Sequence, residues 1–173
     1  MGKDKEVSVT KKIQVFDNFL SDYEFQQLKT LMMGDTFPWY FNNGINHYND
    51  SGYQFTHAFY HNDSHGNLNN PKFSFVEPCV RRLGATRLVR IKANLNHRTL
   101  FHRNGGFHID YKNLYTAILY INTNNGWTKF KGGGKIKCVE NRIVIFDSNI
   151  QHAGFTCTNK KRKVVVNFNY GTN

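Results

Sequence analysis

Three residues in the second half of the chain have the types and the spacing of a metal site. His108 and Asp110 lie two positions apart in the run FHID. Side chains at positions i and i+2 of a β-strand point to the same face. His152 follows 42 residues after Asp110, beyond an apolar run at 143–146 and a turn. Two histidines and one carboxylate form a facial triad that suits non-haem Fe(II) and leaves coordination positions open. The pattern therefore predicts a metal centre.

A basic residue near the C-terminus has the spacing of an anion-binding group. Arg162 lies ten positions after His152 and begins a predicted last strand over 162–168. Arg162, Val164 and Val166 share one face of that strand, which favours an inward direction. An inward arginine needs an anion, and a carboxylate would satisfy it with a bidentate pair. The alternative is a solvated basic turn at 160–163.

A second His-x-Asp pair, His61 and Asp63, lies in a different context. It falls in the segment 61–70, which is rich in Asn, Asp, Ser and Gly and has no apolar pattern beneath it. We expect this segment to be a polar surface loop, which would hold metal ligands poorly.

The elements that must position these residues are mostly short strands. The pattern predicts a strand at 13–16, a helix that begins at Ser21 with Glu24 in a capping box and ends at Gly34, a strand at 53–60, and a helix at 73–83. From Arg87 onward, β-rich runs alternate with turn signals, and we expect strands at 88–96, 99–102, 107–110, 115–122, 135–139, 142–146, 152–156 and 162–170. The sequence therefore predicts an α+β protein dominated by an antiparallel β-sandwich.

Composition limits the classes of protein that remain. The chain has 173 residues, 39% of them hydrophobic, which fits a single globular domain over 1–173. No apolar run is long enough for a membrane span, and the N-terminus lacks a signal-peptide core, so we expect a cytoplasmic protein, or one in the host cytoplasm if it is viral. The three cysteines show no CxxC spacing. The net charge of +11 permits nucleic-acid binding, but the basic residues are spread along the chain.

The motifs together resemble a known enzyme family. FHID, TAILYIN and NRIVIFDSNIQHAG, with Arg162 ten residues after His152, are similar to the 2-oxoglutarate- and Fe(II)-dependent dioxygenases of the prolyl 4-hydroxylase-like group, including small members from marine cyanophages. The resemblance covers residues 87–170, and IQVFDNFLSDYEFQQL resembles the entry to the same proteins. It implies a double-stranded β-helix, a distorted jelly roll, with N-terminal helices packed on one sheet. Residues 1–86 would supply support and substrate loops, and 87–170 the β-helix core.

The resemblance also implies roles for particular residues. His108, Asp110 and His152 would hold Fe(II), Arg162 would bind the distal carboxylate of 2-oxoglutarate, and Asn94 would assist it. The chain departs from the family pattern at Val164, where many members have Ser. Collagen-type prolyl hydroxylases place Lys where Arg162 stands.

The implied activity is hydroxylation of a substrate with O₂ as the second cosubstrate and release of succinate and CO₂. A proline-containing peptide or protein is the first candidate substrate, and a nucleic acid or a free amino acid is the alternative. A non-catalytic jelly-roll or cupin-like binding module is a further alternative, which would have no need of Arg162. The sequence indicates neither the oligomeric state nor the position that is hydroxylated.

Overall fold

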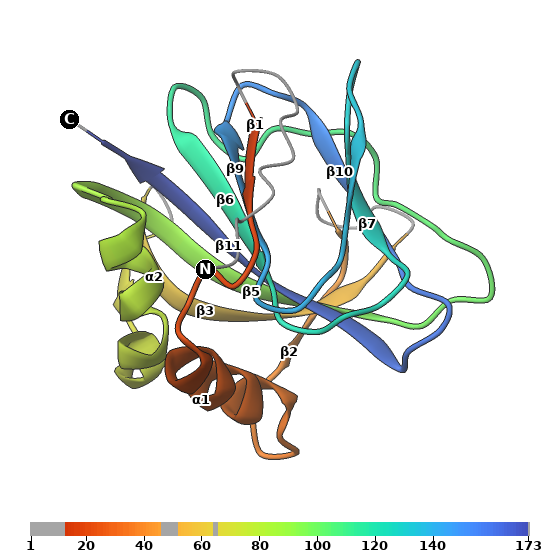
Figure 1. Ribbon diagram of the computed structural model, residues 1–173, viewed down its shortest axis with the longest axis horizontal. Coiled ribbons are helices and arrows are strands. Elements are labelled where there is room, and N and C mark those ends of the chain that lie inside the picture. The colour runs from red at the N-terminus through yellow and green to blue at the C-terminus, as the bar shows by residue number, and fades with distance from the viewer. Residues whose placement is uncertain (1–12, 46–51, 64–65, 173) are drawn as a thin grey trace, which may run out of the picture.

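The computed structural model describes residues 13–45, 52–63 and 66–172. Figure 1 shows the order of the elements along the chain. They are β1 (Ile13–Phe16), α1 (Asp22–Met33), β2 (Tyr40–Asn42), β3 (Gln54–Asp63), β4 (Gly66–Asn69), the 3-10 helix η1 (Pro71–Phe75), α2 (Glu77–Arg82), β5 (Arg87–His97), β6 (Tyr115–Tyr120), β7 (Trp127–Phe130), β8 (Lys135–Lys137), β9 (Ile143–Asp147), β10 (His152–Phe155) and β11 (Arg162–Gly171).

The strands form two antiparallel sheets. The large sheet has the order β1-β9-β6-β11-β5-β3-β2, with β4 paired to β3, and the small sheet has the order β10-β7-β8. Neighbours in the large sheet are far apart in sequence, as when β11 pairs with both β5 and β6. This arrangement confirms the predicted mainly β architecture with the jelly-roll topology of a double-stranded β-helix.

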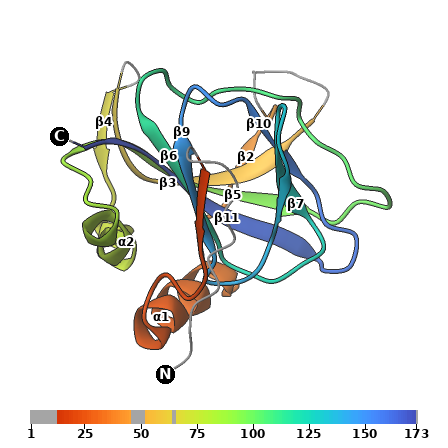
Figure 2. The ribbon, with the colours of Figure 1, turned by 45° about the horizontal axis from the view of Figure 1, so that its top comes forward.

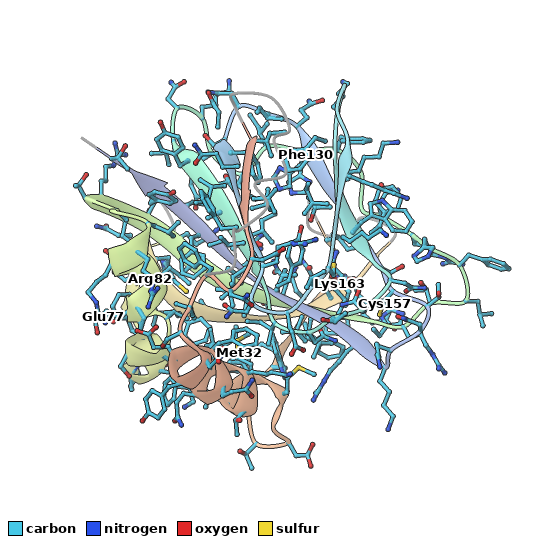
Figure 3. All side chains as sticks on the ribbon, in the orientation of Figure 1. Met32, Glu77, Arg82, Phe130, Cys157 and Lys163 are labelled. Atoms are coloured by element: carbon cyan, nitrogen blue, oxygen red, sulfur yellow. The ribbon has the colours of Figure 1, made fainter. Side chains whose placement is uncertain are left out.

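Helices cover one face of the large sheet, and the small sheet covers the other. In Figure 2, α1 and α2 lie on the side away from β7 and β10. One hydrophobic core joins the helices to the sheet and includes Leu28, Met32, Cys79, Val166 and Phe168. A second core fills part of the space between the sheets and includes Ile118, Tyr120, Phe130, Phe146 and Val165. Figure 3 labels Met32 on the helical side and Phe130 in the small sheet.

The first helix follows the sequence prediction closely. The Ser21 side chain accepts a hydrogen bond from the Glu24 backbone N–H, while the Glu24 carboxylate accepts one from the Ser21 backbone, which completes the capping box. The helix ends at Gly34, and its buried face carries Phe25, Leu28 and Met32. No helix among the described residues is long and apolar enough to cross a membrane.

Several predicted elements differ from the structure. The helix expected at 73–83 is divided into η1 and α2, and Pro78 lies in the first turn of α2, where a missing N–H does no harm. The segment 61–70, expected as a loop, continues β3 to Asp63 and forms the hairpin strand β4. Strands can pair through their backbones without apolar side chains. A polar hairpin therefore lacks the alternation of apolar and polar residues by which a strand is predicted from sequence.

The strands expected at 99–102 and 107–110 do not form. Residues 98–114 lie outside the named strands, and His108 makes only an isolated bridge with His152. This long connection between β5 and β6 carries two of the three candidate metal ligands.

A turn between β8 and β9 fastens the N-terminal segment to the sheet. The Asn141 side chain accepts a hydrogen bond from Leu20 N at 2.9 Å and donates one to Leu20 O at 2.8 Å. Its backbone has φ 56°, a conformation that Asn tolerates. On either side, Glu140 pairs with Lys29 and Arg142 with Asp17.

We expect Asn141→Ala to lower the free energy of unfolding by roughly 2–4 kcal/mol, because two backbone groups of Leu20 lose their partners in a buried place. Asn141→Gly suits the positive φ but also loses both hydrogen bonds, so it should remain destabilised. Urea unfolding followed by tryptophan fluorescence measures both. A stability of Asn141→Gly equal to wild type would show that the backbone conformation, and not the hydrogen bonds, governs this turn.

Candidate metal centre and pocket

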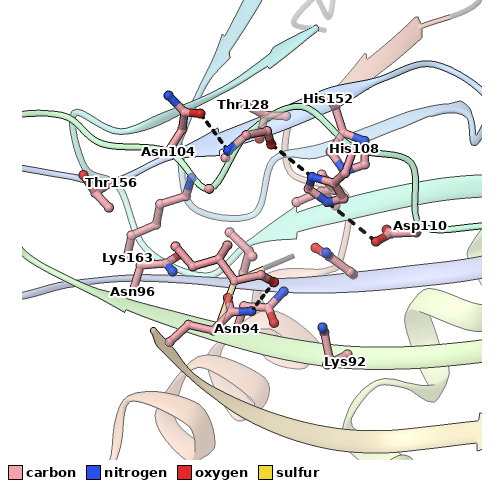
Figure 4. Close-up of a pocket in the computed structure, with 18 of the residues that line it drawn as sticks. Lys92, Asn94, Asn96, Asn104, His108, Asp110, Thr128, His152, Thr156 and Lys163 are labelled. Carbon is pink, nitrogen blue, oxygen red and sulfur yellow. Dashed lines mark hydrogen bonds and ion pairs between the residues drawn. The ribbon is translucent and has the colours of Figure 1, made fainter. Parts of the chain in front are cut away.

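A polar pocket opens between the two sheets and is the main candidate site. It has a volume of about 220 Å³. The large sheet, the small sheet and the connection 103–110 all contribute to its walls, as Figure 4 shows. The polar and charged residues that line it include Arg90, Lys92, Asn94, Asn96, Arg103, His108, Asp110, Thr128, His152, Thr156, Lys163 and Asn167.

The structure brings His108, Asp110 and His152 together at one end of this pocket. One ligand atom from each lies within 4.8 Å of the others, and His108 Nε2 lies 3.8 Å from Asp110 Oδ1. Two backbone hydrogen bonds between His108 and His152, of 3.1 and 3.0 Å, hold the connection 103–110 against β10. The convergence therefore comes from this bridge and not from a regular strand through 107–110.

The orientation of His108 suits a metal ligand. Its Nδ1 donates a hydrogen bond to the carbonyl of Gly106 at 3.2 Å. Since a carbonyl oxygen only accepts, this bond places the proton on Nδ1 and leaves the lone pair of Nε2 directed toward Asp110.

Asp110 is held by residues from two central strands. Arg90 of β5 forms an ion pair with Asp110 Oδ1 at 3.1 Å, and Asn169 of β11 donates to Oδ2 at 3.2 Å. The Arg90 Nε also donates to Asn169 Oδ1 at 3.1 Å, which closes the network. Burial alone would raise the pKa of Asp110, but Arg90, the two histidines and Asn169 outweigh it and lower the pKa to about 2. Asp110 is therefore a carboxylate at neutral pH.

His152 is a buried neutral imidazole. It is 3% exposed, and burial lowers its pKa to about 4 although Asp110 acts in the opposite direction. Its faces pack near Phe146 and His108, with ring centroids 4.9 and 4.6 Å away. A neutral imidazole has a lone pair to offer to a metal ion.

These three side chains fit Fe(II). Two imidazoles and one carboxylate, the donor set of a facial triad, converge within 4.8 Å in the pocket lining.

The structure does not bring Arg162 to this pocket, which corrects its predicted position. The face of β11 that carries Val164 and Val166 points to the helices, where both valines are fully buried in the core. Arg162 is on that same face and donates a hydrogen bond to the backbone carbonyl of Met33 at the end of α1. The prediction that Arg162, Val164 and Val166 share one face of the strand is correct. That face packs against the helices, however, and not toward the pocket.

The neighbouring residue, Lys163, occupies the pocket instead. Lys163 is 2% exposed and donates to the carbonyl oxygens of Phe155 at 2.9 Å and of Trp127 at 3.2 Å. Among the described residues, no carboxylate forms an ion pair with it. An ammonium group buried without an anion is costly, so this lysine is suited to receive one.

Asn94, for which the resemblance implies a role in binding 2-oxoglutarate, lines the pocket. It is 8% exposed, and its Oδ1 is buried with no hydrogen-bond partner among the described residues. Sequence reasoning missed the pocket residues Arg90, Lys163 and Asn167, and it missed Asn169, which contacts Asp110. A signal was present, because polar residues occupy every second position of β5 from Arg90 to Asn96, and Lys163, Asn167 and Asn169 share one face of β11.

Two segments that line the pocket come into close contact at Gly105 and Ile45. A Cβ atom at Gly105 would lie 2.5 Å from Cγ2 of Ile45, so only glycine allows this approach. Gln54 donates to the carbonyl of Ile45 at 3.0 Å and supports it from β3. In a neighbouring hollow that Ile45 and Gly105 also line, Tyr53 stacks on His97 with ring centroids 4.7 Å apart.

Comparisons with known proteins agree with this fold. No protein-family model and no curated protein matches the sequence. Solved structures do match it. An oxidoreductase of the 2OG-Fe(II) oxygenase family from Burkholderia pseudomallei has a TM-score of 0.67 at 11% identity, over 94% of this chain and 88% of that one.

Two prolyl hydroxylases are also similar. The prolyl-4-hydroxylase of Pseudomonas putida has a TM-score of 0.65 at 12% identity, over 95% of this chain and 94% of its own. A prolyl hydroxylase from Trichoplax adhaerens, in complex with a peptide fragment of a hypoxia inducible factor, has a TM-score of 0.59 at 16% identity. The match covers 93% of this chain and 84% of that one. The protein therefore has the fold of the 2-oxoglutarate- and Fe(II)-dependent oxygenases. The predicted likeness to cyanophage members has no support among these neighbours.

We expect the metal-free protein to lose stability as the pH falls from about 6.5 toward 4. His152 causes this loss of stability, because its pKa is about 4 in the folded protein and near 6.5 in the unfolded chain. Between these two values the unfolded chain binds more protons, so lowering the pH favours unfolding. The loss should approach about 3 kcal/mol. Asp110, with its lowered pKa, adds to the loss only below about pH 4. Urea unfolding at pH 7 and pH 5 should show a smaller pH effect in His152→Gln, and an equal effect would contradict this explanation.

Proposed function

We propose that this protein is a Fe(II)- and 2-oxoglutarate-dependent oxygenase that hydroxylates its substrate with release of succinate and CO₂. The observation that carries the proposal is the convergence of His108, Asp110 and His152 within 4.8 Å at the end of a cationic pocket. The shared fold is consistent with it.

In this proposal the three ligands hold the metal and keep one side of it open. His108 and His152 contribute neutral nitrogen donors, and Asp110 contributes the single negative charge. Arg90 and Asn169 hold the Asp110 carboxylate in place through contacts at 3.1 and 3.2 Å. When bound, Fe(II) with 2-oxoglutarate and O₂ supplies the oxidising power for insertion of one oxygen atom into a substrate C–H bond.

Lys163 is our candidate for the residue that binds the distal carboxylate of 2-oxoglutarate. It is buried in the pocket and lacks an acidic partner among the described residues, whereas Arg162 is occupied at the end of α1. Two carbonyl oxygens already fix its ammonium group, so binding costs little side-chain entropy. Asn94, one strand away, supplies an amide to the same pocket.

For the substrate, the resemblance to prolyl hydroxylases favours a proline-containing peptide. The neighbour from Trichoplax adhaerens is itself in complex with a peptide. In this chain, Tyr40 and Phe41 are exposed on β2, and Tyr53 is exposed just before β3, where it lines a hollow that shares residues with the main pocket. Exposed aromatic rings are the usual contact for proline side chains.

The metal assignment is tested by removing one ligand at a time. We expect His108→Ala, Asp110→Ala and His152→Ala to abolish Fe(II)-dependent release of succinate from 2-oxoglutarate, because two ligands hold the ion too weakly. Anaerobic titration of Fe(II) with and without 2-oxoglutarate, followed by the visible absorption of the complex, checks binding separately from turnover. Full activity of Asp110→Ala would contradict the proposal, and a jelly-roll binding module would show no effect of 2-oxoglutarate on the metal.

The carboxylate-binding residue is tested by a pair of adjacent variants. We expect Lys163→Met to weaken 2-oxoglutarate binding about 30-fold to several-thousand-fold, because a buried carboxylate loses its charged partner. The matched variant Arg162→Gln removes a neighbouring charge on the opposite face of β11 and should leave 2-oxoglutarate affinity unchanged. Calorimetric titration of the Mn(II)-loaded protein measures both. The reverse result would return the role to Arg162.

A further inference from the structure

We infer that Lys92 forms a second anion-binding site in the pocket, which receives a carboxylate or phosphate group of the substrate. The inference rests on the proposed function, since it names the chemical class of substrate for the same site. A substrate that enters this pocket is then a small acid, or a larger molecule that presents an acidic group to the metal.

Lys92 is the first observation. It lines the pocket from β5, and its side chain makes no hydrogen bond or ion pair within the described part of the chain. Burial and the nearby Arg90 lower its pKa to about 8, while Asp110 acts in the opposite direction. A bound anion beside this amino group would favour its charged form, and a mostly buried ammonium without a close partner favours a bound anion.

The charge balance of the pocket is the second observation. Four basic side chains line it, whereas Asp110 is the only acidic one among the described residues, and the bases are Arg90, Lys92, Arg103 and Lys163. Asp110 already pairs with Arg90 and would also serve the metal. Fe(II) and the 2-oxoglutarate dianion cancel each other's charge, so binding both leaves the positive excess unchanged. This excess of positive charge would attract a further anionic group.

The two positively charged parts of the pocket, at Lys163 and at Lys92, are also separate. Lys163 pairs across the sheet with Asn96, and Lys92 lies four residues before Asn96 on β5, which is about 13 Å along the strand. In Figure 4, Lys92 lies below Asp110, and Lys163 lies toward the other end of the pocket. A cosubstrate held by Lys163 therefore leaves Lys92 available on the metal side.

The pocket size favours a compact group. Its volume of about 220 Å³ is below the roughly 300–1,000 Å³ common for drug-sized ligands. A neutral proline ring would leave Lys92 buried without a partner. A peptide substrate would instead have to present an acidic side chain or its carboxyl terminus.

The experiment uses an inert ternary complex, so that binding is measured without turnover. The protein is loaded with Mn(II) and N-oxalylglycine, an unreactive analogue of 2-oxoglutarate, and titrated calorimetrically with inorganic phosphate and with acetate. We expect at least one of these anions to bind, with affinity at least tenfold weaker in Lys92→Met. Lys129→Met removes an exposed lysine from β7 outside the pocket lining and should bind as wild type does.

Two further readouts distinguish a binding role from a structural one. Thermal unfolding of the ligand-free protein should show Lys92→Met to be as stable as wild type or more stable, because an unpaired charge is removed. Affinity for N-oxalylglycine should be unchanged in Lys92→Met. Equal binding of phosphate and acetate in wild type and Lys92→Met, or loss of N-oxalylglycine binding in that variant, would overturn the inference.

Failure of the proposed function has a different signature. If Mn(II) and N-oxalylglycine do not bind to wild type, the oxygenase assignment fails. Lys92-dependent binding of phosphate or acetate to the unloaded protein would still support the anion site, and its absence would reject that site. In a screen of succinate release, at least one acidic class should stimulate wild type but not Lys92→Met, the classes being proline peptides with an acidic side chain, free carboxylic acids and phosphate monoesters. Stimulation of both by a neutral proline peptide would overturn the inference.

Discussion

The alternation of side chains along β11 is the constraint on which both halves of the molecule depend. One face of this central strand carries Val164, Val166 and Phe168 into the core beneath the helices. The other face carries Lys163 and Asn167 into the pocket. A shift of one residue in the pairing of β11 would exchange the two faces and place polar groups against the helices. Folding energy and pocket chemistry are therefore specified by the same strand register.

Sequence reasoning succeeded where the information is local and failed where it required knowing which face is covered. The FHID run and His152 indicated a common site, and the Ser21 capping box indicated the first helix. The face of Arg162 was predicted from the assumption that apolar residues point toward the pocket. In a three-layer arrangement the apolar face turns to the helices, and the polar face turns to the cavity.

Other parts of the site arise from contacts that no local pattern contains. Asp110 lies in an irregular connection, yet Arg90 and Asn169 hold its carboxylate from two adjacent strands. These partners lie 20 and 59 residues away in sequence, so only the sheet order brings them together. An irregular segment thus presents a rigid ligand because its charge is anchored on the sheet. The same network explains why the carboxylate keeps its charge despite burial.

The contact of Gly105 with Ile45 couples the shape of the pocket to its chemistry. A Cβ atom at Gly105 would lie 2.5 Å from Cγ2 of Ile45, so a larger residue would displace one of the two segments. The carbonyl of the next residue, Gly106, accepts the hydrogen bond that orients His108, so a displacement of this segment would also turn a metal ligand. At this position, the pocket wall and the reacting centre cannot evolve independently.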